Sequence, residues 1–126
     1  MNYDARIILG IETIIAFLYR DDGKLDENDI EPLNRLRSSI LDAYSEGKLN
    51  ERHYESLVNN ISMLYQEVFK KEIDSLNSLT NNEDKIKLLS KVHSDIEDEY
   101  SKEKVTEKHY NLLKEKISEL KRKYKL

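Results

Sequence analysis

The sequence predicts an all-α protein, an antiparallel bundle of about five helices that is built from repeated helix–turn–helix hairpins and ends in a coiled-coil-like hairpin. Three observations lead to this prediction. The 126-residue chain has three Gly and one Pro, too few turn residues for an all-β domain. Its apolar residues recur at steps of three and four, as they do on one face of a helix. One segment of the chain also occurs twice.

The repeat is clearest between residues 44–57 and residues 100–113, which gives an offset of 56 positions. Both segments read Tyr-Ser, two polar or glycine residues, Lys, an aliphatic residue, Asn or Thr, Glu, a basic residue and then His-Tyr. A fainter copy covers residues 19–36. Each copy has the pattern of a helix end, a turn and a new helix, and a short connection makes the two helices antiparallel neighbours.

The turns have a recognisable chemistry. Gly23 and Gly47 close the first two turns, because glycine readily takes the left-handed conformation that ends a helix. The third turn has Glu103 at this position, so we expect that turn to be looser or shifted by one residue. In each copy an aliphatic residue and then an N-cap residue follow, and the aliphatic side chain can pack over the new first turn; these pairs are Leu25 and Asp26, Leu49 and Asn50, and Val105 and Thr106.

Three helices are predicted in the first part of the chain. The first, about residues 3–20, is apolar nearly all round, which is typical of a helix surrounded by others. The second covers about residues 27–46 and has Pro32 near its start, where a missing N–H costs little. The third covers about residues 51–79 and is long for a single globular element.

The last two predicted helices have narrow apolar stripes and heavily charged backs. The fourth covers about residues 81–102 and begins at the capping box of residues 80–83, Thr-Asn-Asn-Glu. The fifth covers about residues 107–125. Its apolar side chains alternate steps of three and four, a heptad seam suited to two-stranded packing. They are also the candidate partner-binding residues: Tyr110, Leu113, Ile117, Leu120 and Tyr124.

Two arrangements of the chain fit this pattern. Residues 1–80 form an N-terminal three-helix bundle and residues 81–126 form an antiparallel hairpin, which either projects from the long third helix or packs with the rest into one domain. The projecting arrangement is slightly favoured, because one partner helix covers a narrow apolar stripe and leaves little apolar surface of the last two helices to bury against the rest of the chain.

Charge and composition exclude several classes of protein. With no Cys, the chain has no disulfide framework, no Cys-ligated metal site and no Cys nucleophile. Residues 1–80 carry 15 acids and 9 bases, which argues against a nucleic-acid or anionic-membrane partner for the chain as a whole. Asp4 and Arg6 precede the apolar stretch of residues 7–18, and Glu12 and Thr13 interrupt it. The stretch is too short to span a membrane, so we expect a cytoplasmic protein.

Candidate catalytic and metal sites are few. His53 and His109 occupy the same repeat position, but the Glu-x-His spacing before each differs from the Glu-x-x-His of di-iron bundles. The acidic stretch of residues 21–29 fails as a calcium loop, because Leu18 and Arg20 would occupy ligand positions. No Gly-rich phosphate loop or nucleophile elbow occurs. We therefore predict no cofactor, no metal, no catalytic residue and no small-molecule substrate.

The turn sequence Gly47-Lys48-Leu49-Asn50-Glu51, followed by Tyr54 and Leu57, resembles the SHOCT family of short helical modules. Weaker versions lie at residues 23–27 and residues 104–107. The resemblance covers about a dozen residues per copy and implies a role in oligomerisation or docking, without catalysis.

Together these features predict a non-enzymatic helical module for protein–protein interaction or oligomerisation. The alternative is an accessory protein that contacts nucleic acid through the basic C-terminal helix, whose last residues include Lys121, Arg122, Lys123 and Lys125. Cations also suit the last turn of any helix, where they oppose the helix dipole.

Overall fold

The structure, a computed structural model, describes residue 16 and residues 27–126. Over these residues the chain is all helical and contains no strand, so the all-α prediction is confirmed for this part. The predicted first helix and the turn at Gly23 lie outside the described residues. The elements are the 3₁₀ turn η1 (Glu27–Asp29), α2 (Ile30–Ser45), α3 (Glu51–Asp74), the 3₁₀ turn η2 (Ser75–Ser78), α4 (Asn82–Ser101) and α5 (Glu107–Tyr124).

Two predicted boundaries are corrected. The third helix was expected to reach residue 79, but the α-helix ends at Asp74 and continues as η2. The Ser75 hydroxyl donates to the Glu72 carbonyl at 2.6 Å, and such side-chain bonds compete with the helical pattern. At the start of α4 the cap is Asn81 rather than the expected Thr80, and its Oδ1 accepts from the N–H of Glu83 at 2.7 Å.

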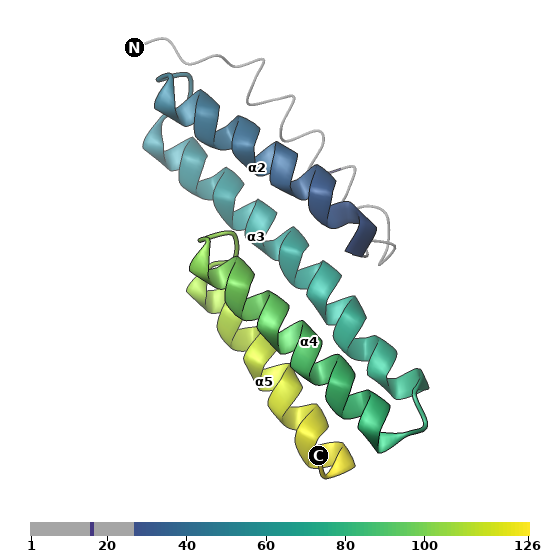
Figure 1. The fold of residues 1–126 in the computed structure, drawn as a ribbon. Helices are drawn as coiled ribbons and strands as arrows, with labels where there is room; N and C mark the ends of the chain where they lie inside the picture. Colours follow the sequence, from purple (N-terminus) through teal and green to yellow (C-terminus); the bar gives the residue numbers. More distant parts are fainter. Residues whose placement is uncertain (1–15, 17–26) are drawn as a thin grey trace.

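The long helix α3 is the centre of the bundle (Figure 1). Helix α2 lies along the first half of α3, and the hairpin of α4 and α5 lies along the second half on the other side. Both α4 and α5 contact α3 as well as each other. The slight preference for a projecting hairpin was therefore wrong, because the hairpin packs along α3.

The reason lies in α3, which is buried on two adjacent stripes. Both stripes follow helical spacing, and together they give this helix enough apolar surface to pack against α2 and against the hairpin. The first stripe contains Leu57, Ile61, Leu64 and Val68, and the second contains Ser62, Tyr65, Phe69 and Ile73. Buried residues on both sides of the predicted domain boundary at residue 80 belong to one core cluster.

Candidate functional site

The corner between α4 and α5 brings together more polar contacts from distant parts of the chain than the corner between α2 and α3. Its backbone repeats the α2–α3 corner at an offset of 56 residues. The N–H of Gly47 donates to the Tyr44 carbonyl at 3.1 Å, and the N–H of Glu103 donates to the Tyr100 carbonyl at 3.0 Å. Gly47 has φ 73° and Glu103 has φ 62°. The expected loosening or shift at Glu103 therefore does not occur.

A side chain of α2 holds this corner. The Arg37 guanidinium donates to the carbonyls of Lys102 at 3.3 Å and of Glu103 at 3.4 Å. Both carbonyls lie just beyond the C-terminus of α4, where the helix dipole is negative and a cation is favourable. Arg37 therefore caps α4 from outside the hairpin and connects the hairpin to α2.

Stacked tyrosines lie beside both corners. The rings of Tyr44 and Tyr54 are 4.1 Å apart, and those of Tyr100 and Tyr110 are 3.9 Å apart. The Tyr110 hydroxyl donates to Glu97 Oε1 at 2.5 Å. This hydrogen bond lowers the pKa of Glu97 and raises the pKa of Tyr110 to about 12. Each stack therefore joins the two helices of its hairpin.

The start of α5 is fastened to the middle of α3 by three side chains. The N–H of Thr106 donates to Ser62 Oγ at 2.7 Å, and Ser62 Oγ lies 2.6 Å from Nδ1 of His109. Thr106 Oγ1 lies 3.0 Å from the same nitrogen. Burial first, and then the charge of Lys108, lower the pKa of His109. A neutral ring without a proton on Nδ1 can thus accept a hydrogen bond from the Ser62 hydroxyl.

The hydroxyl of Thr106 does not cap α5, although the sequence predicts that it would. Thr106 is the N-cap residue of α5, but its side chain makes no capping hydrogen bond to the helix backbone, because the hydroxyl faces His109 instead. In α3 the equivalent residue, Asn50, caps as expected and accepts from the N–H of His53 at 2.7 Å.

A Ser–His contact is also the arrangement that activates a serine for nucleophilic attack. Ser62 is fully buried and His109 is 5% exposed. A reacting group would have to reach Ser62 Oγ through packed side chains of α3 and α5, so the contact acts as a fastener between these helices.

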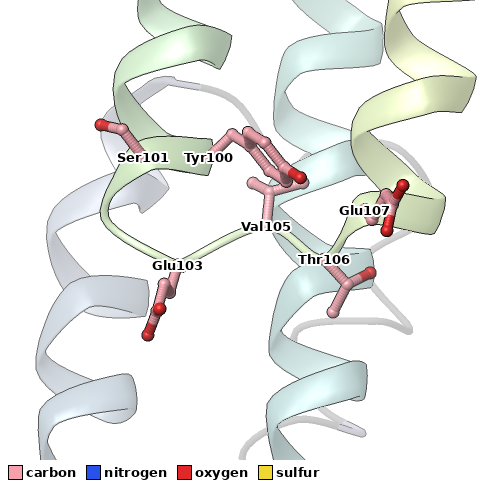
Figure 2. Close-up of a pocket in the computed structure, with 6 residues that line it drawn as sticks. All are labelled: Tyr100, Ser101, Glu103, Val105, Thr106 and Glu107. Atoms are coloured by element: carbon pink, nitrogen blue, oxygen red, sulfur yellow. The ribbon is translucent and has the colours of Figure 1, made fainter.

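A shallow hollow of about 460 Å³ lies over the same corner (Figure 2). In this view the carboxylates of Glu103 and Glu107 point away from each other on opposite sides of the chain. The two carboxylates therefore do not converge on one point of the hollow in this view. The lining residues are Tyr100, Ser101, Glu103, Val105, Thr106 and Glu107. Among the described residues, no group of three His, Asp or Glu side chains is placed to hold a metal ion.

The five predicted partner-binding residues are used inside the chain. Leu113, Ile117 and Leu120 are at most 9% exposed and belong to the core. Tyr110 stacks on Tyr100, as described above. The Tyr124 hydroxyl donates to Asn77 Oδ1 at 2.5 Å, and its ring lies under the ammonium group of Lys85 at 3.9 Å. A second protein could reach the three aliphatic side chains only if the hairpin separated from α3.

The sequence analysis missed Ser62 and Arg37. Ser62 follows the apolar Ile61 within a buried seam, and a serine between such neighbours is a usable signal for a buried polar contact. Arg37 has no such signal, because its acceptors are carbonyls 65 and 66 positions away.

Comparison of the chain with family models, curated proteins and solved structures gives no match. The resemblance to SHOCT modules therefore stays a prediction. None of the described helices has the length and apolarity needed to cross a membrane.

Proposed function

We propose that this protein is a non-enzymatic helical module that binds another protein or a second copy of itself. One observation carries the proposal. The polar side chains of the bundle join helices to one another: His109, a candidate from the sequence, contacts Ser62 and so joins α5 to α3, and Arg37 joins α2 to the α4–α5 corner. Such contacts produce a rigid helical scaffold whose outer faces remain available.

We also infer that the α2–α3 and α4–α5 hairpins are copies of one unit. The shared corner hydrogen bonds and the two tyrosine stacks support this inference. A coiled-coil-like seam between α4 and α5, a cytoplasmic location and the docking role implied by the SHOCT resemblance belong to the same proposal.

The exposed apolar side chains of the hairpin offer points at which to test it. Ile86 on α4 is 49% exposed and Leu112 on α5 is 44% exposed. Single exposed apolar residues are common on any protein, so they serve here as probes of the outer faces of the hairpin.

The test is to capture partners from the native host with the full chain, purify them and measure binding by calorimetry. Sedimentation velocity of the chain alone, over a hundredfold range of concentration, measures self-association. We expect a defined complex with a partner or with itself, weakened by Ile86→Lys or Leu112→Lys if those faces contribute. A chain that stays monomeric and forms no complex with any purified candidate would overturn the proposal.

A further inference from the structure

Helix α5 occupies in its hairpin the place that α3 occupies in the first hairpin, but it lacks the second buried stripe of α3. At an offset of 56 residues, Ser62, Tyr65 and Phe69 of that stripe correspond to Ser118, Lys121 and Lys125. The three residues on α3 are buried, whereas the three on α5 are exposed. On α3 this stripe is covered from both sides, since Ser62 bonds to Thr106 of the hairpin and Tyr65 donates to Asn34 of α2, whereas the equivalent face of α5 is basic and exposed.

One more lysine extends this face toward the start of the helix. Lys114 corresponds to the half-buried Val58, is itself exposed, and lies one helical turn before Ser118. We call Lys114, Ser118, Lys121 and Lys125 the basic stripe.

The charges of the stripe are only partly balanced within the described part of the chain, where the charge of Lys114 helps to lower the pKa of Glu97 from beyond ion-pair distance. Residues 107–125 contain seven bases and three acids. Lys116, which lies on the side of α5 that faces α3, has a carboxylate partner, Asp74, at 2.7 Å. No described carboxylate lies within ion-pair distance of Lys114, Lys121 or Lys125; Lys114 instead lies over the ring of Tyr110 at 5.0 Å.

We infer that the basic stripe docks an acidic helical segment of a partner protein, an inference that rests on the proposed function. Lys114 and Lys121 are seven residues apart on α5, whereas Lys125 follows the last helical residue, Tyr124, and has φ 55°. At a rise of 1.5 Å per residue the two helical lysines are about 10 Å apart along the helix axis. A helix with carboxylates seven residues apart can face Lys114 and Lys121 with one acid each, across the small side chain of Ser118, and a further acid beyond them can reach Lys125 at the end of α5.

The surroundings of the stripe favour a narrow acidic helix over nucleic acid. Glu115 and Glu119 are exposed on the neighbouring face of α5, and Glu97 on α4 lies close to Tyr110. Duplex DNA carries a charge about every 1.7 Å along its axis, so its phosphates would also meet these carboxylates. A single helix, about 10–12 Å wide with its side chains, can present its acids to the lysines and turn its other faces toward these carboxylates.

Exposed charge pairs contribute modestly to affinity and are screened by salt. Docking on the stripe should therefore be reversible and fast, and its affinity should fall with ionic strength, because surface charges act mainly on the association rate. This dependence on salt distinguishes docking on the basic stripe from binding to an apolar face.

The experiment measures binding of the full chain to a labelled helical peptide by fluorescence anisotropy. The peptide has Glu residues seven positions apart, to match Lys114 and Lys121, and a further Glu toward the end that faces Lys125; a second peptide has the same composition in scrambled order. We expect the patterned peptide to bind at least tenfold more tightly than the scrambled one at 50 mM salt, and to lose at least tenfold in affinity at 300 mM.

The decisive variant replaces the three stripe lysines by Gln. Its control replaces Lys70, Lys71 and Lys87, which are exposed elsewhere, by Gln, and so makes the same change in net charge. We expect the stripe variant to lose at least tenfold in affinity and the control to stay within twofold of wild type. Circular dichroism of both variants checks that they keep the wild-type helical content.

Three results would overturn the inference: no binding of the patterned peptide by wild type, equal losses in the stripe and control variants, or equal binding of the two peptides. Tighter binding of a 20-base-pair DNA duplex than of the patterned peptide, at the same salt, would also overturn it and assign the stripe to nucleic acid. If the peptide fails while the chain self-associates or binds a purified partner, only this inference falls, and the proposed function stands.

Discussion

Replacing Ser62 by Ala tests whether the buried contact between α3 and α5 holds the hairpin on the bundle. The substitution removes the acceptor of the Thr106 N–H and the group that faces His109 Nδ1. Two lost hydrogen bonds at about 1 kcal/mol each, less about 0.5 kcal/mol for the better helix propensity of Ala, leave a loss near 1.5 kcal/mol. Buried groups without partners raise the expected loss in free energy of unfolding to about 2 kcal/mol.

The measurement is urea unfolding followed by far-UV circular dichroism, with a melting temperature as a second readout. A loss of about 2 kcal/mol should lower the melting temperature of a chain of this size by roughly 8 °C. The matched control is Ser118→Ala, the equivalent position on α5, where the serine is exposed and the change should stay within about 0.5 kcal/mol. If Ser62→Ala and its control are equally stable, the contact does not fasten the hairpin.

Three further predictions concern the corners and their ionisable groups. Glu103→Gly should raise the free energy of unfolding by up to about 1 kcal/mol, measured by thermal unfolding, because it removes the strain of a left-handed non-glycine residue. Gly47→Ala should lower the free energy of unfolding by a similar amount, although no neighbouring atom lies near the added Cβ. The opposite signs would contradict the strain argument. Burial lowers the pKa of His109, so the unfolded chain binds a proton at His109 more readily than the folded chain does. The contribution of His109 to the free energy of unfolding should therefore be full above about pH 6.5 and fall as the pH drops through 6.5 toward the folded-state pKa. His109→Gln should flatten this part of the curve of stability against pH, and an unchanged curve would exclude His109 as its source. In Tyr110→Phe the pKa of Glu97 should rise toward the usual glutamate range in an NMR titration, since the Tyr110 hydrogen bond is the main cause of its lowering; an unshifted titration would show that the bond is not made in solution.

Features set by neighbouring residues could be predicted from the sequence. Gly47 closes the first described corner, Asn50 caps α3, and Leu49 and Val105 are buried beside the corners as expected. Each depends on chemistry within a few residues: a left-handed glycine, an Asx acceptor and an aliphatic residue before the cap. The apolar spacing of α5 identified Leu113, Ile117 and Leu120 as packing residues, and in the structure they belong to the core of the chain; their contact with a second protein stays a prediction.

Features set by contacts between distant residues could not be predicted. The sequence shows that α5 has an apolar stripe, but the stripe does not show whether the helix that covers it is α3, α4 or another chain. Ser62 meets Thr106 across 44 positions, and although the apolar neighbours of Ser62 indicate a buried contact, they do not identify its partner. The hairpin also packs on α3 through buried residues such as His109, which a hydropathy scale counts as polar.

The two corners show how one backbone shape can be specified in two ways. At Gly47 the left-handed conformation needs no compensation, because glycine has no Cβ. At Glu103 the same conformation costs about 1–2 kcal/mol. The Arg37 guanidinium donates to the carbonyl of that residue at 3.4 Å, a long and exposed hydrogen bond that offsets part of the strain. The first corner is therefore stable within its own hairpin, whereas the second depends on α2 being in place, so the stability of the α4–α5 hairpin is coupled to the bundle on which it packs.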